Sequence, residues 1–163
     1  MHELKASLQR HPTISPVSPP AALLSEQVGD GVYGRVYIAT ERRTKAQYAA
    51  KRVIRRTLHP SDVQAVEDEI AVLKEVSSCN QIIKFQKVYE DEEITTIVME
   101  HFGGQPLIDR LIESKKLTEF YAKEVVRNLM LGVAYCHKKR IANRNLKLDN
   151  ILLVRFDDLF LCY

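Results

Sequence analysis

Three glycines stand close together before a strand-like segment, and this turn constrains the fold more than any other feature of the chain. The turn has the sequence Gly29-Asp-Gly-Val-Tyr-Gly34, and Arg35-Val-Tyr-Ile-Ala-Thr40 follows it. Glycines let a backbone approach phosphate oxygens closely and present N–H groups to them. In a dinucleotide-binding fold such glycines open a helix, whereas β-branched and aromatic residues follow here. The sequence therefore predicts a phosphate-covering β-hairpin, with an ordinary glycine-rich hairpin as the alternative.

A lysine and a glutamate further along the chain suit the same chemistry. Lys51 lies within residues 47–54, whose composition predicts a strand. Glu69 lies beside the apolar face of the next segment, a helix that we expect to begin with Ser61 and Gln64 as a capping box. A strand lysine beneath a glycine hairpin can pair with nucleotide phosphates, and Glu69 is placed to hold it. Taken singly, each residue is more simply a solvated charge.

The remaining pattern predicts an α+β fold in two parts. Further strands are expected over 81–88 and 94–99, and after Gly103-Gly104 the sequence becomes helical, with helices over 107–111 and 118–138. The first part is a small N-terminal antiparallel β lobe with one helix, and the second is the beginning of a mainly helical lobe. The expected divisions are a disordered Pro- and Ser-containing tail (1–24), the β lobe with its connecting hinge (25–102) and the partial helical lobe (103–163). The buried side of the long helix comprises Val125, Leu129, Gly132, Val133 and Cys136.

Composition narrows the class of protein. The chain has 163 residues, of which 45% are hydrophobic and 28% charged, and this excludes wholesale disorder. No stretch approaches the roughly 20 apolar residues that span a bilayer. A net charge of +3 is too weak to indicate nucleic acid or a membrane as partner. Cys79, Cys136 and Cys162 are widely spaced, which argues against disulfides and zinc. They fit a reducing compartment, so we expect the cytoplasm, with the nucleus left open.

Together, these motifs resemble the eukaryotic protein kinases. The family's motif set occurs here in the same order, between about Glu26 and Cys162. The pair Gly103-Gly104 and the segment Tyr135-Cys-His-Lys138 are most similar to the calcium/calmodulin-dependent group of serine/threonine kinases, although no calcium loop of the Asp-x-Asp-x-Asp-Gly type occurs. The segments that carry the resemblance are Gly29–Val36, Ala49–Lys51, Glu69–Leu73, Met99–Gly104 and Ala142–Leu153.

The resemblance implies a role for each matching residue. ATP would be the bound nucleotide, a protein hydroxyl the acceptor, and Mg²⁺ the metal, weakly held. Lys51 would contact the phosphates while paired to Glu69, Lys147 would steady the transferred phosphoryl group, and Asn150 would help hold magnesium. The remaining contacts implied are Gly29, Gly31 and Gly34 over the phosphates, Val28, Val36, Ala49 and Leu152 around the adenine, Met99 as gatekeeper, and Glu100 to Phe102 as the hinge.

Three departures from the family pattern bear on catalysis. Asn145 stands where the family has the aspartate base, and an amide cannot accept the proton of the substrate hydroxyl. General-base assistance is typically worth 10²–10⁴-fold, so we expect a deficit of at least that order. Asn143 replaces a histidine, and its amide needs hydrogen-bond partners or costs stability. Tyr163 stands where the magnesium-binding Asp-Phe-Gly motif would begin, so we expect a truncated product or an incomplete gene model, with magnesium poorly held.

Three functional hypotheses follow from this pattern. The first is a serine/threonine kinase domain that binds ATP and transfers its γ-phosphoryl group poorly. The second is a pseudokinase, a nucleotide-binding or partner-binding module without phosphoryl transfer. The third is a truncated product that does not fold stably, in which the apolar face of the 118–138 helix is exposed.

Overall fold

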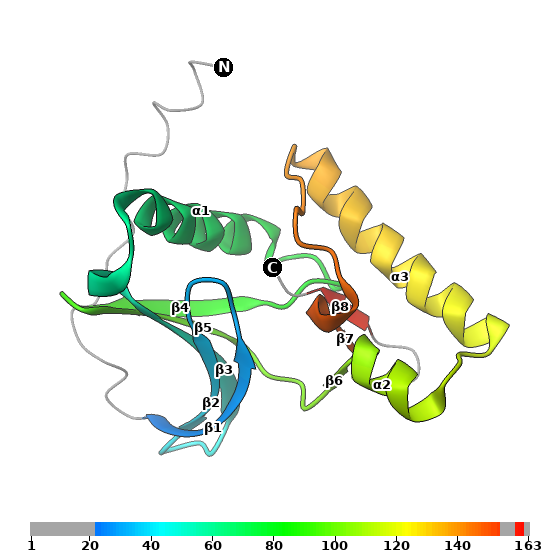
Figure 1. The fold of residues 1–163 in the computed structure, drawn as a ribbon, viewed down its shortest axis with the longest axis horizontal. Coiled ribbons are helices and arrows are strands. Elements are labelled where there is room, and N and C mark those ends of the chain that lie inside the picture. Colours follow the sequence, from blue (N-terminus) through cyan, green and yellow to red (C-terminus); the bar gives the residue numbers. More distant parts are fainter. Residues whose placement is uncertain (1–21, 154–158, 162–163) are drawn as a thin grey trace.

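The computed structural model describes residues 22–153 and 159–161 (Figure 1). The expectations for the tail over 1–21, for Cys162 and for Tyr163 lie outside these residues. None of the described helices is long and apolar enough to cross a membrane. The elements are β1 (Ala22–Asp30), β2 (Arg35–Glu41), β3 (Gln47–Ile54), the 3-10 helix η1 (Arg55–Thr57), α1 (Pro60–Val76), β4 (Phe85–Glu90), β5 (Ile94–Glu100), β6 (Gln105–Pro106), α2 (Leu107–Ser114), α3 (Glu119–Lys138), the 3-10 helix η2 (Leu148–Asn150), β7 (Ile151–Leu153) and β8 (Leu159–Leu161).

The first part of the chain is a five-stranded antiparallel sheet with one helix. Its strand order is β1-β2-β3-β5-β4, which places β3 in the centre. Helix α1 lies along this sheet, while α2, α3 and a small sheet of β6, β7 and β8 lie beside it (Figure 1). The expected α+β fold, a β lobe with one helix followed by the beginning of a helical lobe, is therefore confirmed.

Helix α1 contributes to two separate hydrophobic clusters. Val66, Ile70 and Leu73 pack with Val53 and Ile97 of the sheet. The last residue of the helix, Val76, belongs instead to the second cluster. The other buried members of that second cluster are Cys79, Ile82, Leu107, Val125, Cys136, Ile151 and Leu153. The helix therefore bridges the β lobe and the helical part.

Two local expectations were wrong. The helix α1 begins at Pro60, and its N-cap is His59 without a side-chain cap bond. Proline suits the first helical position, because its missing N–H would be unpaired there in any case. Gln64 bonds to Asp68 rather than back to a cap. The other error is the strand expected over 81–88, which begins only at Phe85. Before it, Gln81 is in a turn, Ile82 forms an isolated bridge, and residues 83–84 belong to no strand.

The start of β1 and the bounds of α3 refine the expectations. Strand β1 begins at Ala22, three residues before the expected start of the folded region. Helix α3 begins after Thr118, whose side chain accepts a hydrogen bond from the backbone N–H of Tyr121 at 3.2 Å. The expected inner side of α3 is buried or half-buried. A further set of large apolar side chains on the same helix is exposed: Phe120, Val126, Met130 and Leu131.

Candidate functional site

One face of the central strand β3 carries the site. Because side chains alternate along a strand, Ala49, Lys51 and Val53 share a face. Val53 is fully buried beneath α1. Lys51 lies opposite Val36 of β2 and Ile97 of β5, and Ala49 lies opposite Met99. Along this single face the environment therefore changes from core packing to a charged pair and then to a half-buried apolar surface.

Lys51 and Glu69 form an ion pair in a largely dry setting. The Lys51 ammonium donates to both carboxylate oxygens of Glu69, at 2.6 and 2.7 Å. The two side chains are only 10% and 16% exposed. A charge removed from water to this degree needs a partner with good geometry, and each residue supplies it for the other. The pairing expected from the sequence is thus formed, and one N–H of the ammonium remains for a further acceptor.

The glycine-rich turn lies directly over this lysine. The backbone N–H of Gly31 donates to the carbonyl of Gly34 at 2.7 Å, which closes the turn between β1 and β2. A Cβ on Gly31 would lie 3.2 Å from Lys51 Cε. A Cβ on Gly34 would lie only 2.2 Å from the carbonyl oxygen of Arg52, inside any allowed contact. Glycine is therefore required at position 34 by the close approach of two backbones.

Substituting Gly34 with alanine should destabilise the protein by about 2–3 kcal/mol, because the β1–β2 hairpin must move away from β3 to accommodate the methyl group. Gly29→Ala is the matched control, since its Cβ would meet only ordinary contacts with Val36 at 3.8 Å. Urea unfolding of both variants measures the difference. Similar midpoints for the two variants would contradict this account of the turn.

The apolar residues expected around an adenine ring lie at the edges of this face. Val36, Ala49 and Met99 are half-buried, and Val28 remains 49% exposed. In β7, Ile151 and Leu153 are buried in the second cluster, so the intervening Leu152 lies on the opposite face of that strand. Half-buried apolar side chains of this kind are available to a planar ring.

The expected hinge follows β5 directly. The backbone N–H of Glu100 donates to the carbonyl of Lys84 at 2.9 Å, which connects the end of β5 to the residue just before β4. The carboxylate oxygen Oε2 of Glu100 is buried and has no partner among the described residues. Phe102 is half-buried, and Gly103 adopts a φ of +64°, a conformation that glycine tolerates without strain. The backbone of residues 100–103 therefore has a defined conformation where it connects the β lobe to the helical part.

Three asparagines organise the loop before β7. The side-chain oxygen of Asn143 accepts a hydrogen bond from the backbone N–H of Asn145 at 2.8 Å. The side-chain amide of Asn150 donates to the carbonyl oxygen of Asn145, also at 2.8 Å. The side chain of Asn145 is exposed, as is that of Lys147. The amide nitrogen of Asn143 is buried without a partner among the described residues, so only half of its expected need for partners is met.

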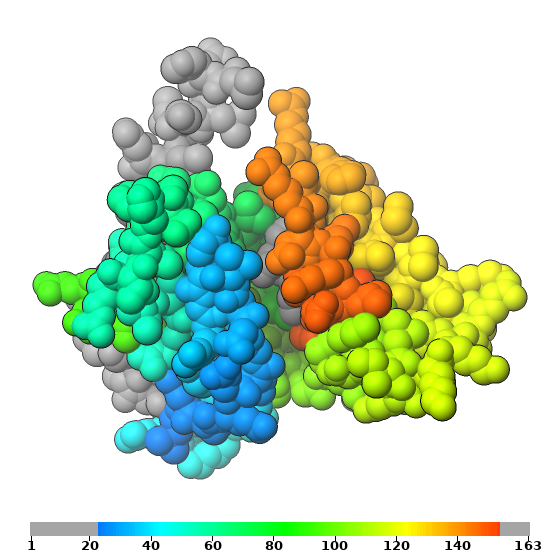
Figure 2. Space-filling model, in the orientation of Figure 1, coloured from blue at the N-terminus to red at the C-terminus, as the bar shows by residue number. Residues whose placement is uncertain are grey.

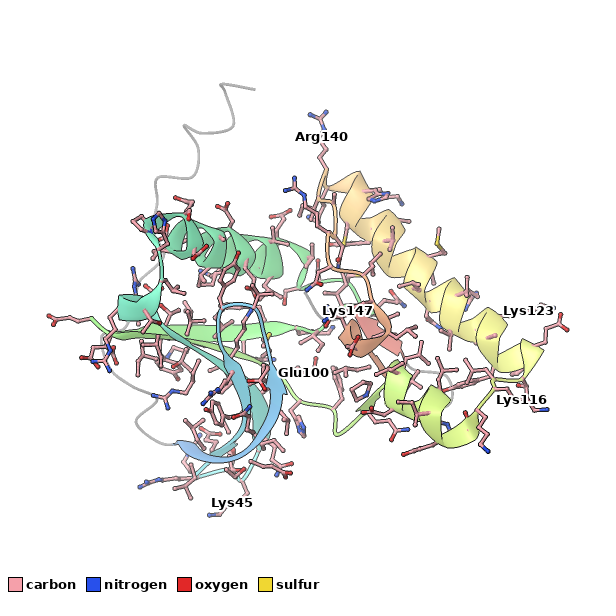
Figure 3. All side chains as sticks on the ribbon, viewed as in Figure 1. Lys45, Glu100, Lys116, Lys123, Arg140 and Lys147 are labelled. Atoms are coloured by element: carbon pink, nitrogen blue, oxygen red, sulfur yellow. The ribbon has the colours of Figure 1, made fainter. Side chains whose placement is uncertain are left out.

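The site residues fall into two groups across a groove. Figure 2 shows the groove between the β1–β2 hairpin and the segment 141–153. Lys51, Glu69 and the glycine turn contact one another on one side, and the asparagine loop is bonded within itself on the other. Figure 3 shows Lys147 on the side of η2 toward the five-stranded sheet. Within the described residues, no hydrogen bond or ion pair joins Lys51 or Glu69 to the asparagine loop.

The residues present fit a nucleotide better than a free metal ion. Among the described residues, no group of three His, Cys, Asp or Glu side chains could hold a metal. Asn150 uses its amide nitrogen on Asn145, which leaves its side-chain oxygen free as a ligand. Magnesium commonly keeps several waters and binds through one or two protein oxygens together with substrate phosphates. Asn150 therefore fits a magnesium ion carried by a nucleotide.

Some of the site was not evident in the sequence. The bonds of Asn143 and Asn150 to the backbone of Asn145 were missed, although an asparagine that bonds to the N–H two residues later is a known turn signal. The bond from Asn150 spans five residues, a separation typical of no standard turn, so nothing in the sequence singled it out.

The site thus combines a glycine-rich hairpin with a buried lysine–glutamate pair in the five-stranded lobe. The family model described as "Protein kinase domain" matches residues 23–162. The chain belongs to the protein kinase family, among the serine/threonine kinases.

The relatives include calcium-dependent protein kinases and a probable myosin light chain kinase. The chain is 36% identical to "Calcium-dependent protein kinase 12" of Oryza sativa subsp. japonica, over 83% of this chain and 26% of that kinase. It is 32% identical to "Calcium-dependent protein kinase 5" of the same species, over 96% and 28%. It is 34% identical to a probable myosin light chain kinase of Dictyostelium discoideum, over 83% and 42%. The chain thus spans about a quarter of the length of the rice kinases it matches.

Proposed function

We propose that this chain binds ATP with Mg²⁺ in the groove between the β lobe and the asparagine loop, and that it transfers the γ-phosphoryl group to a protein hydroxyl only weakly. The observation that carries the proposal is the Lys51–Glu69 pair, which is formed and directed beneath the glycine turn. A lysine held in this way costs little reorganisation when a phosphate arrives.

Each of the chain's own groups has a task toward the nucleotide. The third N–H of Lys51 donates to a phosphate oxygen, while Glu69 keeps the ammonium in place. The backbone N–H groups of the glycine turn face the phosphates once the turn lifts from Lys51, because Gly31 now lies against the lysine side chain. Bound ATP supplies the phosphoryl group itself.

The adenine end and the metal have their own groups. Val36, Ala49, Met99 and Leu152 exclude water from the ring, and the Glu100 to Phe102 backbone offers hydrogen bonds along its edge. The free oxygen of Asn150 contacts the magnesium ion, and Lys147 neutralises charge on the phosphoryl group.

Phosphoryl transfer is weak because of the residue at the base position. The amide of Asn145 can align an acceptor hydroxyl, but it cannot take its proton. Its exposed side chain leaves room for an acceptor. A second candidate function, a nucleotide-binding module without transfer, is favoured by the hydrogen bonds that Asn143 and Asn150 make to the Asn145 backbone. They give the loop a defined shape that does not depend on a carboxylate.

The compartment is also proposed from the cysteines. Cys79 and Cys136 are both buried in the second cluster, and neither is in a disulfide. Buried cysteines outside disulfides fit a reducing environment, which supports a location in the cytoplasm or nucleus.

Thermal unfolding with and without excess ATP and Mg²⁺ tests nucleotide binding. A ligand at 100 times its dissociation constant stabilises the folded state by about 2.7 kcal/mol. For a chain of this size the midpoint should rise by about 5–10 °C. Magnesium without nucleotide is the control and should leave the midpoint unchanged. An unchanged midpoint at millimolar ATP would remove the proposed function.

A further inference from the structure

The five-stranded sheet has a second face, opposite to the one that carries Lys51. Because side chains alternate along a strand, Tyr48, Ala50 and Arg52 of β3 point away from the site. Ala50 lies opposite Tyr37 of the neighbouring strand β2, which therefore shares this orientation. We call this side of the sheet the outer face. Among its long side chains are Tyr37, Tyr48, Arg52, Lys87, Tyr89 and Glu100.

Helix α1 covers the site face of the sheet, where it packs on Val53 and Ile97. Within the described residues, no member of the outer face belongs to either hydrophobic cluster. The small residues Ala39, Ala50 and Thr96 of this face are nevertheless only 3%, 1% and 4% exposed. The tyrosines around them are half-buried. The outer face is therefore a floor of small buried residues bordered by aromatic rings.

The rings of the outer face stand close enough to act together. Tyr48 lies opposite Ala39, which is two residues from Tyr37, so the two tyrosines are diagonal neighbours. Diagonal neighbours lie about 7–8 Å apart, within reach of aromatic side chains. Further across the sheet, Lys87 Nζ lies 4.8 Å from the centre of the Tyr89 ring. Aromatic surfaces of this kind bind proline-rich segments in the polyproline II conformation.

The outer face also contains a hydrogen-bond acceptor without a donor. Glu100 lies opposite Tyr48, so its side chain belongs to this face although its backbone forms part of the hinge. The Oε2 atom of Glu100 is buried and has no hydrogen-bond partner among the described residues. Burying an acceptor in this way costs free energy unless a donor reaches it. The face is therefore suited to a ligand that brings a hydroxyl or an N–H together with apolar rings.

The chain itself contains a segment with this chemistry, directly before the sheet. Residues 11–20 read His-Pro-Thr-Ile-Ser-Pro-Val-Ser-Pro-Pro, with four prolines, three hydroxyl side chains and no Lys, Arg, Asp or Glu. A single residue separates this segment from Ala22, where β1 begins. Proline has no N–H to donate to a strand ladder, so Pro19 and Pro20 cannot extend the pairing of β1. The chain therefore has a reason to leave the edge of the sheet at this point.

The position of β1 and the length of the segment allow it to cross the outer face. Leu24 of β1 lies opposite Ala39, and Ala39 lies opposite Tyr48, so the segment joins the sheet at the end that carries Tyr48. The outermost strands are β1 and β4, four strand spacings or about 19 Å apart. Ten residues of polyproline II extend about 30 Å. The segment is thus long enough to reach Tyr89 on β4.

We propose that residues 11–20 lie across the outer face as a polyproline II helix, running from Tyr48 toward Tyr89, with a hydroxyl that donates to Glu100 Oε2. The inference goes beyond nucleotide binding and does not depend on it, because the outer face is turned away from Lys51. A segment joined to its site by a short connection has a high effective concentration, on the order of millimolar, so weak contacts are sufficient.

A nitroxide label on the segment tests this arrangement in the full chain. Cys79 and Cys136 are buried, so the variant Cys162→Ser confines labelling to a cysteine introduced at either of two positions. These positions are Thr13→Cys and Val17→Cys. The tyrosines are replaced biosynthetically by 3-fluorotyrosine, and Tyr→Phe variants assign their fluorine signals. A nitroxide broadens the signals of nuclei that lie near it, and its reduction with ascorbate gives the reference spectrum.

The two labels should affect different rings. The label at position 17 should remove most of the intensity of Tyr48 and less of that of Tyr89, and the label at position 13 should reverse this order. Tyr121 and Tyr135 of α3 should keep their intensity with both labels. An undocked segment would broaden Tyr48 more than Tyr89 with either label, because position 13 is then further from every ring. That pattern overturns the inference.

A proline-free segment is the matched control. Pro12→Gly/Pro16→Gly/Pro19→Gly leaves the sheet unaltered and keeps the length of the segment, so it should give the undocked pattern with both labels. An unchanged reversal in this variant would contradict docking through prolines. Mixing labelled chains with unlabelled fluorinated chains tests the source of the contact. Broadening in the mixture would assign the segment to a second copy and overturn docking within one chain.

Discussion

Replacing Asn145 with aspartate should raise the rate of phosphoryl transfer from ATP by about 10²–10⁴-fold. The new carboxylate can accept the proton of the acceptor hydroxyl, which the amide cannot. The substitution is nearly isosteric, and the side chain is exposed. Both described hydrogen bonds of Asn145 use its backbone, so the loop keeps its shape in the variant. Transfer of labelled γ-phosphoryl groups to a mixture of serine and threonine peptides measures the rate.

Asn145→Ala is the control for this prediction. It removes both the alignment and the base, so its rate should be equal to or lower than that of the wild type. The pH dependence adds a second criterion, because a working carboxylate base loses activity as it becomes protonated at low pH. Equal rates for Asn145→Asp and Asn145→Ala would show that this position does not limit transfer.

Lys51→Met should abolish the ATP-induced rise in the unfolding midpoint and destabilise the protein by about 3–5 kcal/mol. The loss of binding follows from the missing phosphate contact. The loss of stability follows because Glu69, only 16% exposed, is left without its cation. Thermal unfolding with and without ATP measures both effects in one experiment.

The double variant Lys51→Met/Glu69→Leu separates the two effects. Apolar replacement of both partners of a buried ion pair is often neutral or stabilising. The double variant should therefore recover most of the lost stability and still fail to respond to ATP. If it regains the ATP response, Lys51 has no part in nucleotide binding.

The central part of the fold was predictable because its signals are local. Strand β3 has the bounds that its composition indicates, residues 47–54. The glycine turn could be assigned to a hairpin because the residues after it suit a strand and not a helix. The Lys51–Glu69 pair could be anticipated because a lysine in the middle of a sheet needs a nearby carboxylate, and the helix offers Glu69 beside its apolar face.

The two wrong predictions, the start of α1 and the strand over 81–88, concern positions where the sequence favours two alternatives almost equally. Ser61 and His59 both lie near the start of α1, and Pro60 decided the boundary by taking the first helical position. Ile82 and Ile83 suggested a strand, yet Ile82 forms only an isolated bridge and Ile83 lies outside any strand, although both side chains are buried. The strand pattern therefore indicated burial there and not secondary structure.

The polar contacts between distant segments could not be predicted. Glu75 and Lys139 are two of many charged residues, and 64 positions separate them in the chain. Their pairing depends on where α1 and α3 end in space, and Val76 and Cys136 near these ends are buried in the same cluster. The asparagine loop is similar, since the bond from Asn150 to Asn145 depends on the path of η2.

The division of α1 between two hydrophobic clusters has a thermodynamic consequence. Leu73 and Val76 lie within one turn of each other, yet they stabilise different clusters. Melting of the last turn of α1 therefore removes buried area from both clusters at once. The β lobe and the helical part are thus coupled in unfolding. A cavity created in one cluster therefore also lowers the stability of the other. Because the last turn of α1 contributes to both hydrophobic clusters, the two clusters unfold together as one unit.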